Sequence, residues 1–100
     1  MQVSVVTPNY NGEKFLKAFF DSLNQDCEFI GELIIVDNGS SDGSRDYIKN
    51  YSFNFPVNLI ENSENLGFAP AVNQAIRQSK YDYIFSINND TEIKKGSIKA

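Results

Sequence analysis

The sequence contains no histidine and a single cysteine, Cys27. The absence of histidine excludes catalytic triads with an imidazole base and metal sites with imidazole ligands. With one cysteine the chain can form no internal disulfide, which is typical of proteins in a reducing compartment. We expect Cys27 to be a buried or helix-end thiol, because a nucleophilic thiol would need an activating base beside it.

Long apolar runs and clustered positive charge are also missing. No stretch approaches the roughly 18 apolar residues of a membrane-spanning helix, and residues 1–8 (MQVSVVTP) lack the basic start of a signal peptide. The net charge is −4, from 13 acidic and 9 basic residues. Because nucleic-acid binding depends on clustered Lys and Arg, this balance argues against a nucleic-acid partner. We expect a cytoplasmic protein, and peripheral association with the inner face of the membrane is the alternative location.

What the chain does contain is typical of one globular domain. Its 100 residues include 41% hydrophobic and 13% aromatic residues, enough for one modest core. Short apolar runs alternate with stretches in which apolar residues recur at helical spacing. The runs predict strands at 3–6, 33–36, 57–60 and 83–87, and the periodic stretches predict helices at 13–26, 44–51 and 68–79, with a further element starting at 93.

The alternating order of these elements predicts the fold class. Strands that alternate with helices pair in parallel through right-handed crossovers. Residues 33–36 (LIIV) are apolar without alternation, as expected of a strand covered on both faces. We therefore predict an α/β fold of Rossmann-like, three-layer α/β/α architecture, with a parallel sheet of about four strands.

Each predicted strand ends in a loop rich in amides, hydroxyls and carboxylates. In a parallel sheet such loops lie along one edge, where ligands bind. The last loop begins most abruptly, since the apolar run 83–87 stops at Asn88, Asn89 and Asp90. A polar turn is the alternative for each loop, because Asn, Asp and Gly are also turn formers. The other loops are 7–12 (TPNYNG), 37–43 (DNGSSDG) and 61–67 (ENSENLG).

Three side chains in these loops suit a nucleotide ligand. The sequence has neither GxGxxG nor GxxxxGK[ST], so phosphates would be held by a metal or by helix N-termini. Asp90 is a candidate anchor for a divalent cation whose remaining ligands are diphosphate oxygens. Asp37, at the end of a buried strand, can accept hydrogen bonds from a base or ribose. Tyr10 offers a ring on which a base can stack, and packing within the loop is its alternative role.

Four blocks of the sequence resemble, in order and spacing, the family-2 glycosyltransferases, the inverting GT-A enzymes that use nucleotide-diphospho-sugars. The blocks are VSVVTPNYNGEKFL, LIIVDNGSSDGS, NLGFAPAVNQAI and FSINNDTEI, and they cover essentially the whole chain. The second and third blocks look most like members that build bacterial cell-surface polysaccharide, including rhamnosyltransferase-like ones. The resemblance implies transfer of a sugar from a UDP, dTDP or GDP donor to a hydroxyl of a saccharide or lipid-linked acceptor.

The resemblance further implies that the first three blocks line the base, ribose and sugar of the donor. The first block matches the family's first nucleotide loop, and the carboxylate of the second block matches the one that recognises the base. The third block lies near the ribose and sugar. The nucleotide-binding residues implied in these blocks are Thr7, Pro8, Tyr10, Asp37, Asn65, Gly67 and Asn73.

The fourth block implies a metal site and departs from the family pattern. Asn88, Asn89 and Asp90 stand at the family's DXD position, where Asp90 matches the aspartate that binds Mn²⁺ or Mg²⁺. The amides of Asn88 and Asn89 can bond to a ribose, so both are also expected to bind the nucleotide. Because these amides bring no charge to the metal, we expect metal affinity to depend on the bound diphosphate.

A second departure concerns length. Family members are much longer, and their general base comes from an acceptor half beyond position 100. We therefore expect residues 1–100 to be the nucleotide-diphospho-sugar-binding half of a GT-A domain, truncated before the acceptor half, with little or no transferase activity alone. Such a half-domain would expose the face on which the other half packs, and this favours self-association.

Three other interpretations fit parts of the pattern. A sugar nucleotidyltransferase resembles the GT-A fold but usually carries a glycine-rich, basic loop after the first strand, where residues 7–12 have only Lys14 nearby. A non-catalytic remnant would keep the fold and bind a nucleotide or self-associate. A CheY-like domain also has carboxylates at strand ends, but no phosphoacceptor Asp follows the third predicted strand and no fifth strand is evident.

Overall fold

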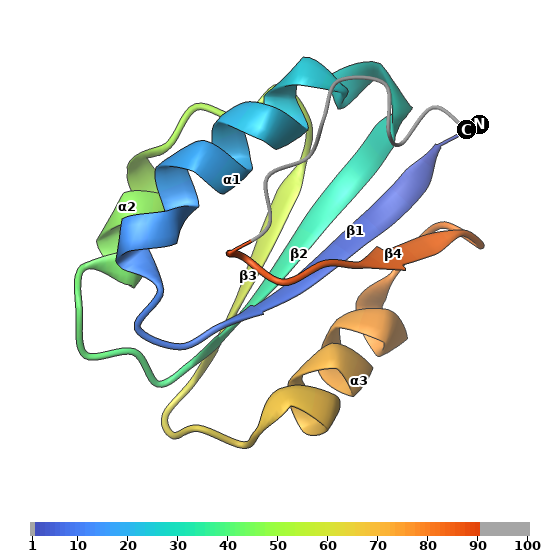
Figure 1. Cartoon of the computed structure of the whole chain (residues 1–100). Coiled ribbons are helices and arrows are strands. Elements are labelled where there is room, and N and C mark those ends of the chain that lie inside the picture. The colour runs from blue at the N-terminus through green and yellow to red at the C-terminus, as the bar shows by residue number, and fades with distance from the viewer. Residues whose placement is uncertain (1, 91–100) are drawn as a thin grey trace.

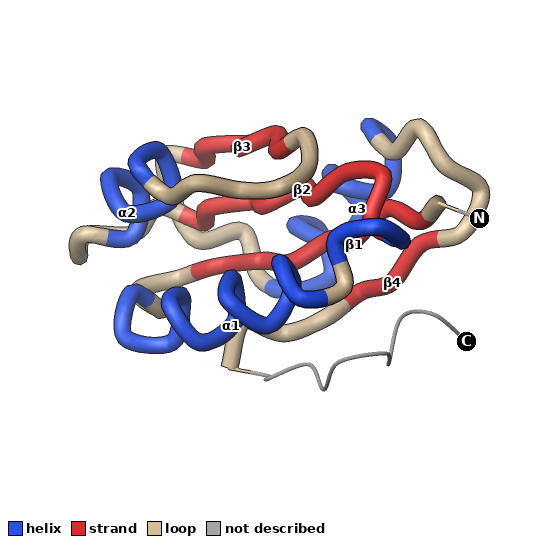
Figure 2. The backbone as a smooth tube through the Cα atoms, turned by 90° about the horizontal axis from the view of Figure 1, so that it is seen from above, coloured by secondary structure: helices blue, strands red, loops and turns tan. Residues whose placement is uncertain are grey.

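A parallel sheet in the order β3-β2-β1-β4 forms the middle layer of the computed structural model, which describes residues 2–90 (Figure 1). Figure 2 shows the strands side by side in this order. The α/β fold class with parallel pairing is as the sequence predicts. The strands are β1 (Val3–Asn9), β2 (Ile30–Asn38), β3 (Val57–Asn62) and β4 (Ile84–Ser86).

Helices cover both faces of this sheet (Figure 1). On one face lie α1 (Glu13–Gln25) and α2 (Ser44–Asn50), and on the other lies α3 (Phe68–Gln78). A short 3₁₀ helix, η1 (Cys27–Phe29), follows α1, and the partly buried Cys27 lies at its start, in agreement with a helix-end thiol. None of the helices in the described part of the chain has the length and hydropathy of a membrane-spanning helix.

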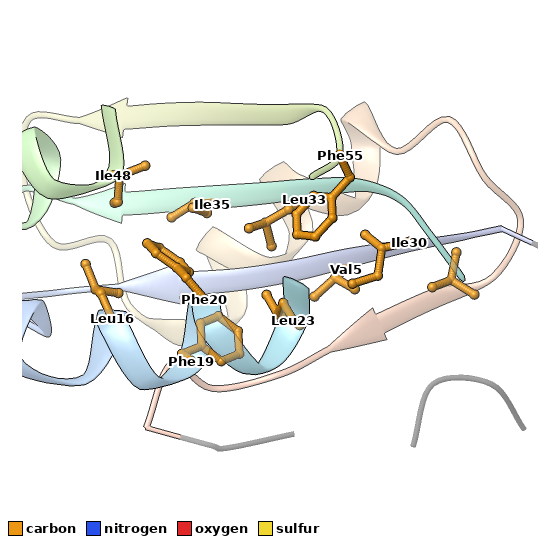
Figure 3. Close-up of a cluster of buried hydrophobic side chains, with 11 residues drawn as sticks. Val5, Leu16, Phe19, Phe20, Leu23, Ile30, Leu33, Ile35, Ile48 and Phe55 are labelled. Atoms are coloured by element: carbon orange, nitrogen blue, oxygen red, sulfur yellow. The ribbon is translucent and has the colours of Figure 1, made fainter. Parts of the chain in front are cut away.

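The two central strands separate two apolar clusters. Every residue of β2 is buried, because successive side chains of a strand point to opposite faces and both faces are covered. Leu33 and Ile35 face α1 and α2, whereas Ile34 and Val36 face α3. Figure 3 shows the larger cluster, in which side chains of α1 interdigitate with those of β1 and β2.

The buried side of α1 is narrower than the sequence suggests. Leu16, Phe19, Phe20 and Leu23 are buried, as the helical spacing predicts. Phe15 was expected on the same side, but 40% of its surface is exposed and the Lys14 ammonium lies 5.1 Å from its ring centre. The stripe at i, i+3, i+4 and i+7 already fills the contact with the sheet, so Phe15 lies outside it.

A similar correction applies to α3. Ala71 and Ala75 are buried against the sheet, whereas Val72 is only partly buried and Ile76 is 41% exposed. The expectation that all four face inward was therefore wrong for Ile76. Ala71 and Ala75 lie one above the other on the face against the sheet, and Ile76 lies about 100° farther around the helix axis, toward solvent.

Element boundaries differ from the predicted ones mainly at strand ends. Pairing of Pro8 with Val36 and of Asn9 with Asp37 extends β1 and β2 into segments that were expected to be loops. Proline is tolerated there because β4 pairs only with residues 4–6 of β1, so Pro8 has β2 alone as a neighbour. The element expected from residue 93 lies outside the described residues.

Phe20→Ala tests the larger cluster. The Phe20 ring packs against the rings of Tyr47, Tyr51 and Phe53, at centre-to-centre distances of 4.8 to 6.1 Å. We expect the substitution to lower the free energy of unfolding by about 3–5 kcal/mol in urea titrations, because it leaves a cavity. The matched control Phe15→Ala should change it by less than about 0.5 kcal/mol. Equal losses in the two variants would contradict this packing.

Candidate functional site

A pocket of about 220 Å³ opens at the carboxyl ends of β1 and β2, beside the start of α3. Four residues that the sequence analysis assigned to a nucleotide site line it: Pro8, Tyr10, Asn65 and Gly67. Carboxyl ends of parallel strands are where α/β sheets bind ligands. The remaining lining residues, which the sequence analysis did not single out, are Asn9, Asn38 and Phe68.

Two aromatic rings border this pocket while remaining largely in solvent. Tyr10 is 53% exposed and Phe68 is 56% exposed. Exposed rings beside a polar pocket offer flat apolar faces on which a planar ligand can stack. Phe68 follows Gly67 as the first residue of a predicted helix, and a large apolar side chain at this polar strand edge was the signal that could have drawn attention to it.

Two buried amides form the polar lining, and both are the last residues of their strands. Asn9 is 1% exposed and Asn38 is 3% exposed. The Asn38 amide nitrogen donates to the carbonyl oxygen of Gly67 over 3.2 Å, and Asn38 Oδ1 accepts from Asn62 over 3.1 Å. These bonds fix the start of α3 against the ends of β2 and β3. The sequence did not indicate that these two amides are buried, because strand pairing continues past the expected ends of the strands.

Asp37 lies next to the pocket in sequence but does not line it. Its carboxylate is fully buried and accepts four hydrogen bonds, which is about the capacity of a carboxylate. The donors are Asn9 Nδ2 at 2.9 Å, the backbone N–H of Ser40 at 3.0 Å, Ser40 Oγ at 2.6 Å and Arg45 Nε at 2.6 Å. A base could bond to Asp37 only by displacing one of these donors.

The same contacts keep Asp37 ionised. Burial by itself would raise the pKa of this carboxyl, but hydrogen bonds from Ser40, Arg45 and Asn9 outweigh it and hold the pKa below its usual range. Arg45 also donates to the carbonyl oxygen of Asn62 over 2.7 Å. The ion pair therefore connects the end of β2 to the end of β3.

Several polar groups of loop 37–43 bond to the loop that follows β1 and to the first residue of α1. Asn11 Oδ1 accepts from the backbone N–H groups of Ser41 and Asp42, at 2.7 and 3.2 Å. In return, the N–H of Glu13 donates to Asp42 Oδ2 and the N–H of Gly43 donates to Glu13 Oε1, both over 3.1 Å. These reciprocal bonds hold the two loops in a fixed relation along the edge of the sheet.

Gly39, in the loop after β2, allows a close contact with the loop after β3. Its φ of 79° is in the left-handed region, and a Cβ atom there would lie 2.9 Å from the backbone of Glu64. The loops after β2 and β3 therefore pack backbone to backbone.

One hydrogen bond connects the loop after β4 to the pocket. Asn89 donates from Nδ2 to Oδ1 of Asn9, which lines the pocket. Asn88 and Asp90 are exposed, and Asp90 forms no ion pair with another residue of the 2–90 segment. Asp90 therefore lies at the same edge as the pocket, with its carboxylate open to solvent.

The described residues hold no group of three or more His, Cys, Asp or Glu side chains that could bind a metal. Asp90 offers an exposed carboxylate at the edge of the sheet, and Glu64, in the loop after β3, offers another. Hard divalent cations bind through one or two carboxylates when phosphate oxygens and water supply the other ligands. The residues present therefore fit a cation held jointly with a phosphorylated ligand.

Two other residues from the sequence analysis do not line the pocket. Thr7 is 1% exposed within β1, and its hydroxyl donates to the carbonyl oxygen of Pro8 over 3.4 Å. Asn73 is exposed on α3. The structure thus brings together Pro8, Tyr10, Asn65 and Gly67, and leaves Thr7 and Asn73 outside the lining.

Comparison with known families agrees with this edge-of-sheet site. The family model described as "Glycosyl transferase family 2" matches residues 4–100. The chain belongs to this family. The family assignment that the four sequence blocks implied is therefore confirmed.

Two relatives named as glycosyltransferases come from Bacillus subtilis (strain 168). The glycosyltransferase YfnE is 35% identical over 91 residues, which are 90% of this chain and 23% of YfnE. TuaG, named as a glycosyltransferase of teichuronic acid biosynthesis, is 31% identical over 98 residues, which are 97% of this chain and 39% of TuaG. The chain thus spans less than half the length of either relative.

Solved glycosyltransferase structures confirm the GT-A fold. Staphylococcus aureus TarS 1-349 in complex with UDP superposes with a TM-score of 0.88 at 26% identity, covering 99% of this chain and 30% of the TarS chain. The mannosyltransferase PcManGT of Pyrobaculum calidifontis, in complex with GDP-Man and Mn²⁺, gives a TM-score of 0.78 at 23% identity, covering 91% of this chain and 28% of PcManGT. At that identity the second comparison concerns the fold alone.

Asp37→Asn tests the buried ion pair through the pH dependence of stability. Because folding lowers the pKa of Asp37, its contribution is complete above the unfolded value of about 4 and is lost as the pH falls through the folded value. We expect the variant to lose about 2–3 kcal/mol of unfolding free energy at pH 7, the scale of hydrogen bonds to a charged group. The difference from wild type should shrink below about pH 4.

The control for this measurement is Asp82→Asn, a substitution of an exposed carboxylate. It should follow the wild-type curve at both pH values. Urea titrations at pH 7 and pH 3 give the comparison, and an Asp37→Asn deficit that is the same at both pH values would contradict the ionised, hydrogen-bonded state of Asp37.

Proposed function

We propose that this segment binds the nucleoside diphosphate part of a nucleotide-sugar and serves as the donor-binding half of an inverting glycosyltransferase. The observation that carries the proposal is the pocket at the ends of β1 and β2, where exposed rings border buried amides. A nucleoside needs this combination, because its base presents flat apolar faces and a polar rim.

The size of the pocket matches one end of such a donor. Its volume of about 220 Å³ is below the roughly 300–1,000 Å³ of pockets that enclose a drug-sized ligand. We assign the base to the space beside Tyr10 and Phe68, with the amide nitrogen of Asn65 available for a hydrogen bond. The diphosphate then extends along the edge of the sheet toward Asp90.

Relatives support a donor of the nucleotide-sugar class. TarS structures hold UDP and UDP-GlcNAc at 26% identity. The poly-beta-1,6-N-acetyl-D-glucosamine synthase of Staphylococcus aureus is 38% identical over 60 residues, which are 60% of this chain and 15% of the synthase. We therefore place a UDP-sugar first among donors, before dTDP- and GDP-sugars. The acceptor is a saccharide or lipid-linked hydroxyl in polysaccharide synthesis, and the location is cytoplasmic or at the inner face of the membrane.

The proposed mechanism divides inverting transfer between this chain and a group outside residues 2–90. A divalent cation, Mn²⁺ or Mg²⁺, when bound, neutralises charge on the leaving diphosphate, and Asp90 would hold it. Tyr10, Phe68 and the Asn65 amide would hold the base and ribose, which fixes the donor in one orientation. The proton of the acceptor hydroxyl passes to a general base that we assign to none of the described residues.

A second candidate function is self-association without catalysis. Tyr83 is 59% exposed beside β4, and Ile76 is 41% exposed on α3. Exposed apolar side chains of this size mark interaction surfaces when they are contiguous. Sedimentation of the chain, with and without nucleotide, separates this candidate from nucleotide binding.

Tyr10→Ala tests the base site by calorimetric titration with UDP, GDP and dTDP. We expect one diphosphate to bind, and the variant to lose about 5- to 150-fold in affinity, because base stacking contributes about 1–3 kcal/mol. The matched control is Tyr83→Ala, which removes a ring of similar exposure outside the pocket lining and should leave the affinity unchanged. Failure of the folded wild-type chain to bind any of the three would contradict the proposed function.

Asp90→Ala tests the metal site in the same titration. In the wild type we expect Mn²⁺ to tighten diphosphate binding by about 5- to 150-fold, the usual range of coupling between two ligands. The variant should bind equally with and without Mn²⁺, whereas the exposed control Asp82→Ala should behave as wild type. A Mn²⁺ effect that survives in Asp90→Ala would place the cation elsewhere.

A further inference from the structure

Asn9 connects the buried carboxylate to the loop after β4. It is the last residue of β1 and pairs in the sheet with Asp37 of β2. Its amide nitrogen donates to Asp37 Oδ1 over 2.9 Å and to Ser40 Oγ over 3.2 Å, while its Oδ1 accepts from the Asn89 amide nitrogen. With 1% of its surface exposed, Asn9 has no other environment in which to satisfy these groups.

The direction of each bond follows from the chemistry of Asp37. An ionised carboxylate only accepts hydrogen bonds, so Asn9 must turn its amide nitrogen toward it. The Asn9 carbonyl oxygen then faces the loop after β4, where it needs a donor. Asn89 supplies that donor with its own amide nitrogen, and its Oδ1 makes no hydrogen bond within residues 2–90. The negative charge of Asp37 therefore sets the orientation of the Asn89 amide, through the hydrogen bonds of Asn9.

Gly12 provides independent evidence that the fold reserves space for this contact. A Cβ atom at Gly12 would lie 2.4 Å from Asn89 Nδ2 and 2.6 Å from Asn9 Oδ1. Real Cβ atoms essentially never approach other heavy atoms so closely. Residues 9–12 and the loop after β4 thus meet at one hydrogen bond, and a Cβ atom at position 12 would force the Asn9 and Asn89 side chains to shift.

The network crosses the sheet in strand order. Arg45 joins Asn62 at the end of β3 to Asp37 at the end of β2, and Asn9 joins Asp37 to Asn89 beyond β4. Asn89 immediately precedes Asp90 in the chain. A side chain that fixes Asn89 therefore also restricts where the carboxylate of Asp90 can lie.

We propose that Asn9 is a positioning residue, which holds Asn89 and Asp90 at the place where the diphosphate of the donor binds. The inference rests on the proposed function, since it concerns the phosphate end of the same ligand. Asn9 acts through Asn89, so its loss should weaken binding of a nucleoside diphosphate and spare binding of the nucleoside. A residue that merely supported the fold or the base pocket would affect both ligands equally.

The test is a double-mutant cycle read by calorimetry in the presence of Mn²⁺. The proteins are wild type, Asn9→Leu, Asn89→Leu and the double variant, and the probes are UDP, GDP and dTDP, each beside its own nucleoside. Leucine matches asparagine in shape and makes no hydrogen bonds. We expect Asn9→Leu to weaken diphosphate binding about tenfold, the effect of one lost hydrogen bond, and nucleoside binding less than about twofold. In the Asn89→Leu background the same substitution should change diphosphate binding less than about twofold.

Asn9→Ser provides a second variant in case Asn9→Leu does not fold. Its short hydroxyl side chain keeps a polar group beside Asp37 but cannot span the distance to Asn89, so the same selective loss of diphosphate affinity is expected. Equal losses for nucleoside and diphosphate, or a tenfold loss that persists without Asn89, would overturn the positioning role. Absence of diphosphate binding in the wild type would instead contradict the proposed function itself.

Discussion

The buried carboxylate of Asp37 is the interaction on which the carboxyl edge of the sheet depends. It accepts hydrogen bonds from Asn9 on β1, from Ser40 in its own loop and from Arg45 on α2. A buried charge that loses its partner costs several kcal/mol. The charge of Asp37 therefore ties these three elements together at the edge of the sheet, and its donors help to hold the loops that border the pocket.

This arrangement decides which groups remain for a ligand. Arg45 neutralises Asp37, and Lys49 pairs with Glu61 at 3.2 Å, so these charges balance within the protein. What faces the pocket is then uncharged: rings, amides and backbone. Exposed carboxylates lie outside the lining, at Glu64 and Asp90, and Asp90 repels a diphosphate unless a cation lies between them. A nucleotide-sugar donor has an uncharged nucleoside and a charged diphosphate. A neutral pocket suits the first, and a carboxylate that shares a cation with the ligand suits the second.

The sequence was sufficient to predict the layers of the fold and the edge that carries the site. Alternation of apolar runs with helical periodicity fixed the parallel sheet, and the polar strand ends pointed to the edge where Tyr10 and Gly67 line the pocket. It could not separate polar groups that face a ligand from those that face another loop, because turns and binding sites use the same residue types. Asp37 was predicted to contact a base, yet its acceptors are filled by donors such as Arg45, eight positions away. Asn38 was overlooked because strand pairing continues past the end of the apolar run.

The most direct test of a nucleotide site at this edge is an NMR titration of the ¹⁵N-labelled chain with UDP. We expect the largest shifts for the amide signals of pocket residues, led by Tyr10, Asn38 and Phe68, and we expect the signal of Asn89 to shift with them. Signals around a second hollow of about 280 Å³, lined by Ile48 and Lys49 of α2 and by Val57 and Leu59 of β3, should stay in place. Shifts confined to that second hollow, or no shifts with UDP, GDP or dTDP in a folded chain, would contradict a nucleotide site at the ends of β1 and β2.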